Sequence, residues 1–263
     1  MKKNWDEDER FCRERLGIQN ARGSLARRLR ELSTVADLSE EERLSLPLSR
    51  GRFLVVDLET TGMKPEQARI IEVGAVEVNG FGFGRELASL VNPGTSIPYF
   101  ITRLTGIHNG MMFNAPRLEE ILPLLEAMLR GRVLVAHNCR FDFAFLKSAW
   151  RRVFNRPLTV PALCTVKLSR RVYPELESHN LDFLAGYLKI KPDENRGTKA
   201  RHRALGDARI TARALVKMCR KLNQEGMDSV SELLLLQSSR RVKAKPRLPS
   251  PPADPVETPG TGD

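Results

Sequence analysis

The sequence has few cysteines and no long apolar run. Its four cysteines, Cys12, Cys139, Cys164 and Cys219, include no CxxC pair and no regular spacing, so neither a zinc site nor a disulfide framework is indicated. No apolar segment approaches the roughly 18 residues of a membrane span, and the first residues lack the apolar core of a signal peptide. These absences predict reduced thiols, a cytoplasmic location and no membrane partner.

Aromatic residues are also scarce, at 6%, but 41% of the 263 residues are hydrophobic, which is enough to bury one sizeable core. Acidic residues are outnumbered, because 43 lysines and arginines against 32 aspartates and glutamates give a formal net charge of +11. Such a balance fits a polyanionic partner, most simply nucleic acid, and it fits mere solubility equally well.

The two ends of the chain differ from its centre. Residues 1–50 are charged and helix-prone, and Ser39 and Glu42 have the spacing of a capping box at a helix start. The last residues are rich in proline and contain no aromatic residue, a composition typical of a disordered tail. The expected organisation is a helical N-terminal extension (1–50), a central domain (51–224), a helical segment (225–237) and a disordered tail (238–263).

The central domain begins with strands and continues with strands and helices in alternation. Residues 52–59 form a nearly continuous apolar strand, and 69–78 and 81–91 form a hairpin around Asn79 and Gly80. The later segments are a helix at 115–131, a strand at 132–138, a helix at 141–154, a strand or short helix at 162–172, and helices at 180–190 and 205–222. This order predicts an α/β fold with a mixed sheet flanked by helices.

Acidic residues lie at the end of one predicted strand and shortly after another. Asp57 and Glu59 end the first strand, and residues i and i+2 of a strand point the same way, so their carboxylates lie side by side. Each raises the pKa of the other unless an Arg or Lys, a shared proton or a metal ion stands between them. Asp142 opens a helix after a later strand, where acidic residues also simply complement the helix N-terminus.

A third acidic segment contains His202, Gly206 and Asp207. Five residues on a helix correspond to a rotation of about 140°, so His202 is expected in the loop before the helix that carries Asp207. Gly206 is costly inside a helix, and close approach of the helix to the sheet is one physical reason to keep it.

Four carboxylates that converge at one edge of a sheet require cations, and oxygen ligands suit Mg²⁺ and Mn²⁺. Two alternatives remain at this point. A glycosidase needs only two carboxylates, which leaves Asp207 and the basic charge without a purpose. The other is a structural cluster neutralised by arginine, since Arg52, Arg69 and Arg140 are close in sequence.

The segments DLETTG (57–62), HNCRFD (137–142) and HRALGD (202–207) together resemble the three motifs of the DEDDh-type 3′-to-5′ exonucleases. This family includes the proofreading epsilon subunits of bacterial DNA polymerase III, and the likeness covers about residues 52–222. It implies a ribonuclease H-like fold with a mixed five-stranded sheet. It also implies a metal-dependent exonuclease that releases nucleoside 5′-monophosphates from a 3′ end, with DNA favoured over RNA.

The resemblance implies roles for single residues. Asp57, Glu59 and Asp207 would bind one divalent ion, either Mg²⁺ or Mn²⁺. Asp57 would also bridge to a second ion, which Asp142 supports through water. His202 would take the proton from the attacking water.

Substrate contacts are also implied by the family motifs. Thr60, Thr61 and Gly62 would line the pocket of the terminal nucleotide, although a plain turn has the same composition. Asn138 is a weaker candidate for substrate binding, and Phe141 fits the core as well.

The segment RLSLPL (43–48) resembles a short motif that binds sliding clamps, but Arg43 stands where that motif prefers Gln. Its position just before the first strand favours a packed linker. The expected partner is nucleic acid with a free 3′ end, with a DNA polymerase or a sliding clamp as a candidate second partner. The rival functions are an RNA-trimming member of the same family and a catalytically idle nucleic-acid-binding or polymerase-scaffolding module.

Overall fold

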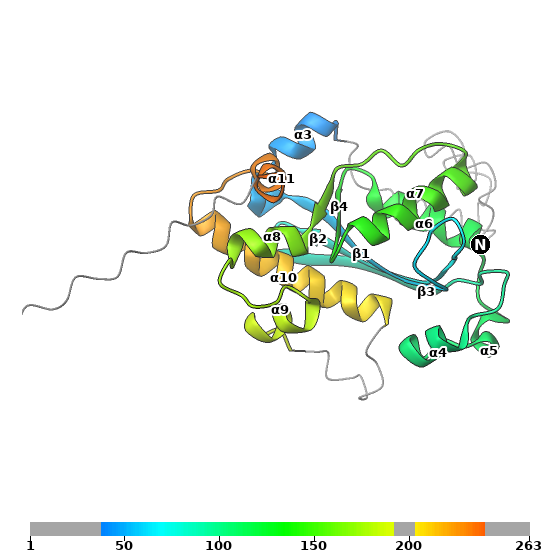
Figure 1. The fold of residues 1–263 in the computed structure, drawn as a ribbon. Helices are drawn as coiled ribbons and strands as arrows, with labels where there is room; N and C mark the ends of the chain where they lie inside the picture. Colours follow the sequence, from blue (N-terminus) through cyan, green and yellow to red (C-terminus); the bar gives the residue numbers. More distant parts are fainter. Residues whose placement is uncertain (1–37, 192–202, 240–263) are drawn as a thin grey trace, which may run out of the picture.

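The computed structural model of the chain describes residues 38–191 and 203–239. Its five strands form one mixed sheet in the order β3-β2-β1-β4-β5 (Figure 1). These strands are β1 (Arg52–Thr60), β2 (Ile70–Asn79), β3 (Gly82–Leu90), β4 (Val133–Ala136) and β5 (Ala162–Cys164). β2 pairs antiparallel with β1 and β3, whereas β4 pairs parallel with β1 and β5. The predicted mixed five-stranded sheet is confirmed.

The β2–β3 hairpin turns one residue later than predicted. Asn79 still pairs with Gly82, so the two residues of the turn are Gly80 and Phe81. Gly80 has a φ of 58°, which glycine adopts at little cost. The Asn79 side chain accepts a 2.7 Å hydrogen bond from Arg132, a tertiary contact that favours keeping Asn79 in the strand.

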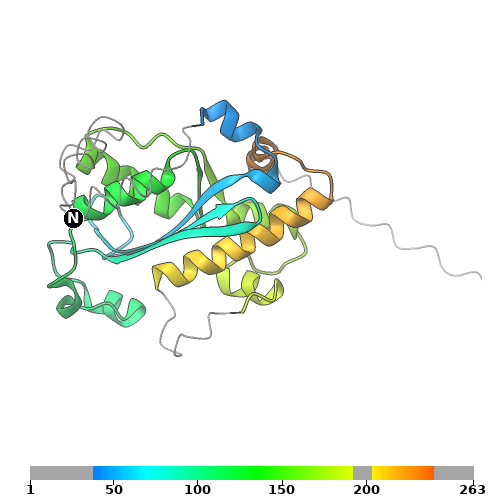
Figure 2. The ribbon, with the colours of Figure 1, turned by 180° about the vertical axis from the view of Figure 1, so that it is seen from behind.

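Helices cover both faces of the sheet (Figures 1 and 2). Two pack on one face, α6 (Leu118–Leu129) and α7 (Arg140–Phe154), and three on the other, α8 (Thr165–Val172), α9 (Leu181–Tyr187) and α10 (Ala204–Gln224). The segment predicted as a strand or a short helix at 162–172 divides into both, β5 and α8. Two short helices, α4 (Tyr99–Thr105) and α5 (Asn109–Met112), were not predicted.

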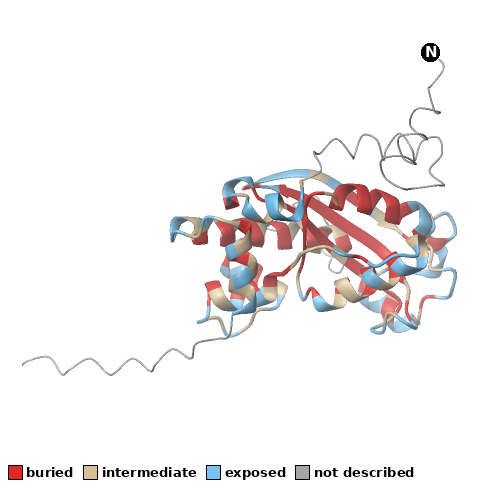
Figure 3. Ribbon diagram, turned by 90° about the horizontal axis from the view of Figure 1, so that it is seen from above, coloured by how far each residue is buried: buried red, intermediate tan, exposed pale blue. Residues whose placement is uncertain are grey.

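The long strands in the middle of the sheet are largely buried (Figure 3), and the central strand β1 is packed on both sides. Leu54, Val56 and Leu58 belong to the cluster under α6 and α7. Phe53 and Val55 belong to the cluster under α10. Because strand side chains alternate, residues 57 and 59 fall on the same face as Phe53 and Val55. The sheet therefore directs Asp57 and Glu59 toward α10.

Residues before the sheet pack against residues after the last long helix. These elements are α3 (Glu40–Ser45), the 3₁₀ helix η1 (Leu48–Arg50) and α11 (Val230–Ser238). The capping box predicted at Ser39 and Glu42 is present at the start of α3. Leu48 is fully buried, and its N–H donates to the backbone carbonyl of Asp228 over 2.8 Å. The segment RLSLPL is therefore a packed linker in this structure.

The side chain of Gln237, on α11, contacts the outer edge of β5. The N–H of Cys164 donates to Gln237 Oε1 over 2.8 Å, and Gln237 Nε2 donates to the carbonyl of Ala162 over 2.8 Å. One amide group thus satisfies two backbone groups of the edge strand.

Several predictions concern residues outside the described ranges. These are most of the helical extension (1–37), His202 and nearly all of the proline-rich tail. The boundaries of the central domain (51–224) stay predictions. Among residues 38–191 and 203–239, no helix combines the length and the apolar composition needed to cross a membrane.

The packed linker makes Leu48 important for stability. Leu48→Ala should lower the free energy of unfolding by about 2–5 kcal/mol, because it leaves a cavity in a fully buried site. Leu235→Ala is the matched control, since Leu235 is 70% exposed on α11 and its loss should change stability by less than about 0.5 kcal/mol. Urea denaturation of both variants measures the difference. Equal stability of the two variants would contradict the packing of this segment.

Candidate metal centre

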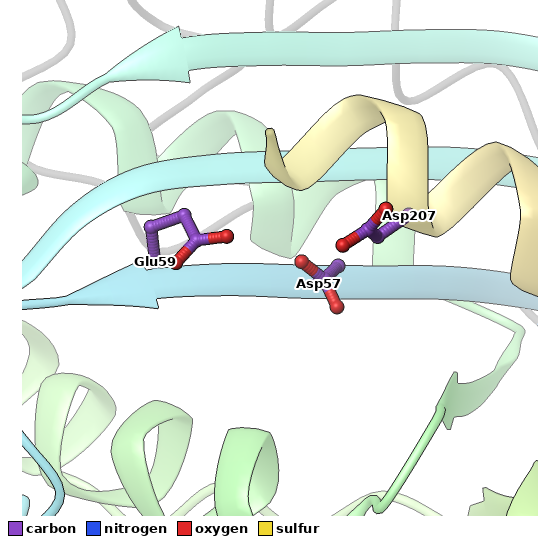
Figure 4. A group of neighbouring side chains, drawn as sticks. All are labelled: Asp57, Glu59 and Asp207. Atoms are coloured by element: carbon purple, nitrogen blue, oxygen red, sulfur yellow. The ribbon is translucent and has the colours of Figure 1, made fainter. Parts of the chain in front are cut away.

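Three carboxylates from two distant segments meet beside β1. Asp57 and Glu59 extend from β1 and Asp207 from the first turns of α10 (Figure 4). One oxygen from each lies within 4.8 Å of the others. The structure therefore brings together the first and third acidic segments that the sequence singled out.

Local features of β1, β2 and α10 explain this meeting. Gly74 on β2 pairs with Asp57, and a Cβ at Gly74 would lie 2.2 Å from backbone atoms of Ala204 and Leu205. The helix backbone thus packs directly on the strand, and Gly74 is the residue that makes room for it. Gly206, from which a close approach was expected, is also buried. The β1–β2 register shifts between Glu59 and Thr60, an irregularity of the kind that often occurs beside functional sites.

Asp142 lies next to this group, in the first turn of α7, and is only 4% exposed. Burial raises its pKa to about 7, although hydrogen bonds with the backbone of Asp142 itself and Leu58 oppose the rise. Its charge in turn raises the pKa values of Asp57 and Glu59. Asp142 is thus an electrostatic neighbour of the three carboxylates without belonging to their close group.

The two carboxyl groups of β1 resist ionisation. Loss of hydration, followed by the charges of Asp142 and Asp207, raises the pKa of Asp57 well above its usual value. Loss of hydration and the charge of Asp207 are also the main causes that raise the pKa of Glu59 to about 8, while Arg203 opposes this rise. Near neutral pH the cluster therefore holds protons unless a cation replaces them.

The arginines suggested as neutralising partners do not fill that role in the described part of the chain. No ion pair there joins Arg52, Arg69 or Arg140 to the acidic cluster. Arg203 is close enough to lower the pKa of Glu59, but its guanidinium group is bound to Glu72. A site built from carboxylate oxygens fits a hard divalent cation.

The residues after Asp57 and Glu59 form a tight turn. The hydroxyl of Thr60 donates to the carbonyl of Gly62 over 2.6 Å, and the hydroxyl of Thr61 accepts from the N–H of Arg69 over 2.9 Å. Both threonines are buried, at 6% and 9% exposure. Their hydroxyls hold the turn together, and the substrate contacts predicted for Thr60, Thr61 and Gly62 stay predictions.

The remaining site candidates lie around the start of α7 or outside the described residues. Asn138 is exposed at the junction of β4 and α7 with a φ of 62°, an uncommon conformation for a residue other than glycine. The Phe141 ring is 4.9 Å from that of Phe145 and packs against the core under α6 and α7. His202 precedes the first residue of α10 by two positions and lies outside the described ranges.

Glu72 is a site residue that the sequence did not single out. It lies directly opposite Glu59 on β2 and is only 3% exposed. Its charge raises the pKa values of both Asp57 and Glu59. The available signal was an acidic residue inside the apolar run IIEVGAVEV, where a buried charge needs a partner.

Comparison with known proteins gives matches over this same region. The model of the RNase T exonuclease family matches residues 54–215. The PolC-type DNA polymerase III of Caldanaerobacter subterraneus subsp. tengcongensis is 40% identical over 197 residues, which are 74% of this chain and 13% of that protein. The epsilon subunit of DNA polymerase III from Aquifex aeolicus is 36% identical over 174 residues, which are 65% of this chain and 82% of that protein.

The fold also matches solved structures. Exonuclease X in complex with 5′ overhanging duplex DNA superposes with a TM-score of 0.55 at 24% identity, covering 69% of this chain and 99% of that one. At that identity the likeness concerns the fold, which is the ribonuclease H-like arrangement expected from the sequence.

The raised pKa values predict how stability depends on pH in the absence of metal. Glu59 and Asp142 titrate near 8 and 7 in the folded protein, above their ordinary values of 4.5 and 3.8. The folded state therefore binds more protons than the unfolded state, and its stability is lost as pH rises through these folded pKa values. In EDTA, the melting temperature should fall as the pH rises from about 5 to about 8, and Mg²⁺ should restore it at the upper end of this range.

Asp57→Asn tests this account directly, because it removes from the crowded cluster one carboxyl group whose pKa is raised in the folded state. In EDTA at about pH 8, the variant should melt about 2–4 °C or more above the wild type, and Mg²⁺ should stabilise it less. Glu66→Gln removes an exposed carboxylate and serves as the control. A lower melting temperature for Asp57→Asn than for Glu66→Gln under these conditions would refute the electrostatic explanation.

Proposed function

The chain belongs to the RNase T exonuclease family, and from this premise we propose that it is a metal-dependent 3′-to-5′ exonuclease acting on DNA. The observation that carries the proposal is the group of Asp57, Glu59 and Asp207, whose carboxylate oxygens lie within 4.8 Å of one another. These are the acidic residues of the first and third motifs of the family that the sequence resembles. The product would be a nucleoside 5′-monophosphate.

Two divalent ions, Mg²⁺ or Mn²⁺, are part of the proposal. The donor set fits, because it consists of carboxylate oxygens, and burial together with the neighbouring carboxylates raises the pKa values of Asp57 and Glu59. Asp57, Glu59 and Asp207 would hold one ion. Asp57 would also hold the second ion, which Asp142 would support through water. Bound ions supply an activated water molecule and neutralise charge on the phosphodiester.

The protein residues have separate tasks in this proposal. The carboxylates must be ionised to bind cations, so the metal-free cluster must release protons when ions bind. His202 would accept a proton from the attacking water, since a neutral imidazole suits that task near neutral pH. The turn of Thr60, Thr61 and Gly62, together with Asn138, would position the terminal nucleotide.

The partner is nucleic acid with a free 3′ end, which the formal net charge of +11 supports. A DNA polymerase is a proposed second partner, because one similar protein is named a PolC-type DNA polymerase III and another the epsilon subunit of DNA polymerase III. A sliding clamp is less well supported, because Leu48 of the candidate motif is fully buried. A cytoplasmic location accompanies these proposals.

Digestion of labelled oligonucleotides tests the function. With Mg²⁺ or Mn²⁺, 5′-labelled DNA should shorten from its 3′ end into a ladder, and EDTA should stop the reaction. Asp57→Ala should lower the rate by more than the roughly 10–100-fold typical of residues that only support metal ligands. Glu66→Gln should retain full activity, since Glu66 is exposed and lies outside the cluster.

The same assay distinguishes the rival functions when it includes RNA and both single- and double-stranded substrates. Ladders from RNA alone would replace the DNA exonuclease with an RNA-trimming enzyme. Intact oligonucleotides that nevertheless bind would favour the idle module.

His202 has its own test. His202→Ala should lower kcat by about 10²–10⁴-fold, the usual contribution of a general base, while Mn²⁺ binding stays as in the wild type. His108→Ala is the control, because His108 is exposed at the start of α5 and has no proposed role in catalysis. Unchanged kcat in His202→Ala would remove this histidine from the mechanism.

A further inference from the structure

Glu72 is a buried carboxylate with both oxygens occupied. Glu72 Oε1 accepts from Arg203, with Nε and Nη2 each at 2.8 Å, and Oε2 accepts from the N–H of Ala204 at 3.0 Å. Because both oxygens are engaged by protein groups, Glu72 does not act as a further ligand for the cation. Its binding partners instead belong to the start of α10.

The start of α10 depends on this carboxylate. Arg203 is the N-cap residue, and its own side chain makes no capping hydrogen bond. The first N–H groups of a helix have no partner within the helix, and a negative charge near them is favourable. The Glu72 carboxylate supplies an acceptor for the N–H of Ala204 and a negative charge near the helix start. A side chain of β2 thus caps a helix that lies more than a hundred residues later in the chain.

Charge balance explains why Arg203 accompanies Glu72. Two glutamates directly opposite each other on adjacent strands repel, and Glu59 and Glu72 form such a pair. The ion pair with Arg203 compensates Glu72 without adding a net charge beside Asp57 and Glu59. Arg203 also lowers the pKa of Glu59, so its charge acts on the cluster as well.

Gly74 is the third residue that fixes the start of α10 against β2. It lies two residues after Glu72 on the same face of β2, where a Cβ would be 2.2 Å from the backbone of Ala204 and Leu205. A hydrogen bond, an ion pair and a backbone contact thus fix the first turn of α10. Asp207 follows one turn later and points toward Asp57 and Glu59 (Figure 4).

We propose that Glu72 and Arg203 are positioning residues that hold Asp207 at the distance at which the three carboxylates share one divalent cation. The inference rests on the proposed exonuclease function for its catalytic consequence, but its effect on metal binding does not require activity. Misplacement of a ligand by about 1 Å is enough to cost about 10²-fold in rate.

Glu72→Gln tests the proposal with a matched control on the same strand. It keeps the size of the side chain and removes the charge that binds Arg203. Glu77→Gln makes the same change in another buried glutamate, 2% exposed, which is paired with Arg85 and Arg132. Both variants remove the charge of a buried glutamate that is paired with arginine, but only Glu72 contacts the start of α10.

Three measurements on the full chain separate positioning from general destabilisation. Mn²⁺ titration calorimetry should show about 10–100-fold weaker binding for Glu72→Gln and wild-type binding for Glu77→Gln. Amide hydrogen exchange in EDTA should increase in the first turn of α10 for Glu72→Gln alone. The Mg²⁺ concentration for half-maximal digestion of a single-stranded DNA oligonucleotide should rise for Glu72→Gln alone, and Arg203→Lys should retain more metal affinity than Arg203→Ala.

The outcomes are distinguishable from failure of the proposed function. If the wild type digests DNA but Glu72→Gln and Glu77→Gln have the same metal affinity and the same exchange at α10, the positioning role is wrong. If the wild type digests no nucleic acid but Glu72→Gln still weakens Mn²⁺ binding and loosens α10, the proposed exonuclease activity is wrong and the positioning of Asp207 stands.

Discussion

Repulsion among carboxylates that the fold crowds into one place is the constraint on which the rest of this structure depends. Asp57 and Glu59 cannot move apart, because they are alternate residues of one strand that is paired with β2 at both positions and packed on both faces. Asp207 and the buried Asp142 add charge from two helices. A site of this kind destabilises the metal-free protein and becomes favourable when cations bind. Relief of the repulsion among the carboxylates therefore contributes to the affinity for cations.

Packing of helices on both faces of the sheet offsets the repulsion among the carboxylates. The sheet is covered by α6 and α7 on one side and by α10 on the other, so the acidic face is built on a rigid support. The packing of α10 on β2 matters most, because that helix carries Asp207, which is distant in sequence from Asp57 and Glu59. Glu72, Gly74 and Arg203 fix this docking through polar and backbone contacts in addition to apolar burial.

Much of this arrangement was predictable because it follows from local patterns. The alternation of side chains along a strand placed Asp57 and Glu59 side by side, and the order of strands and helices predicted a mixed sheet. The role of Glu72 was not predictable in the same way. Glu77 interrupts the same apolar strand equally well, and nothing local shows that Glu72 alone pairs with an arginine 131 residues later.

Other differences between expectation and structure also have tertiary causes. The hairpin turn lies one residue later than predicted, and the hydrogen bond between Asn79 and Arg132, a residue from a distant segment, favours this position. The helix α4 was missed because it is seven residues long and begins after Pro98 without a side-chain cap. Thr60 and Thr61 have the composition of a substrate loop, and only the structure shows that their hydroxyls hold the turn together.

The hydrogen bonds between the side chain of Gln237 and β5 affect the tendency of this protein to self-associate. β5 is an outer strand of the sheet, and the unpaired backbone of such a strand is a template for pairing with a strand from another molecule. By binding the N–H of Cys164 and the carbonyl of Ala162, Gln237 occupies the positions that an incoming strand would use. The helix α11 therefore protects the β5 edge of the sheet from pairing with a strand of another molecule, and loss of Gln237 would expose these two backbone groups.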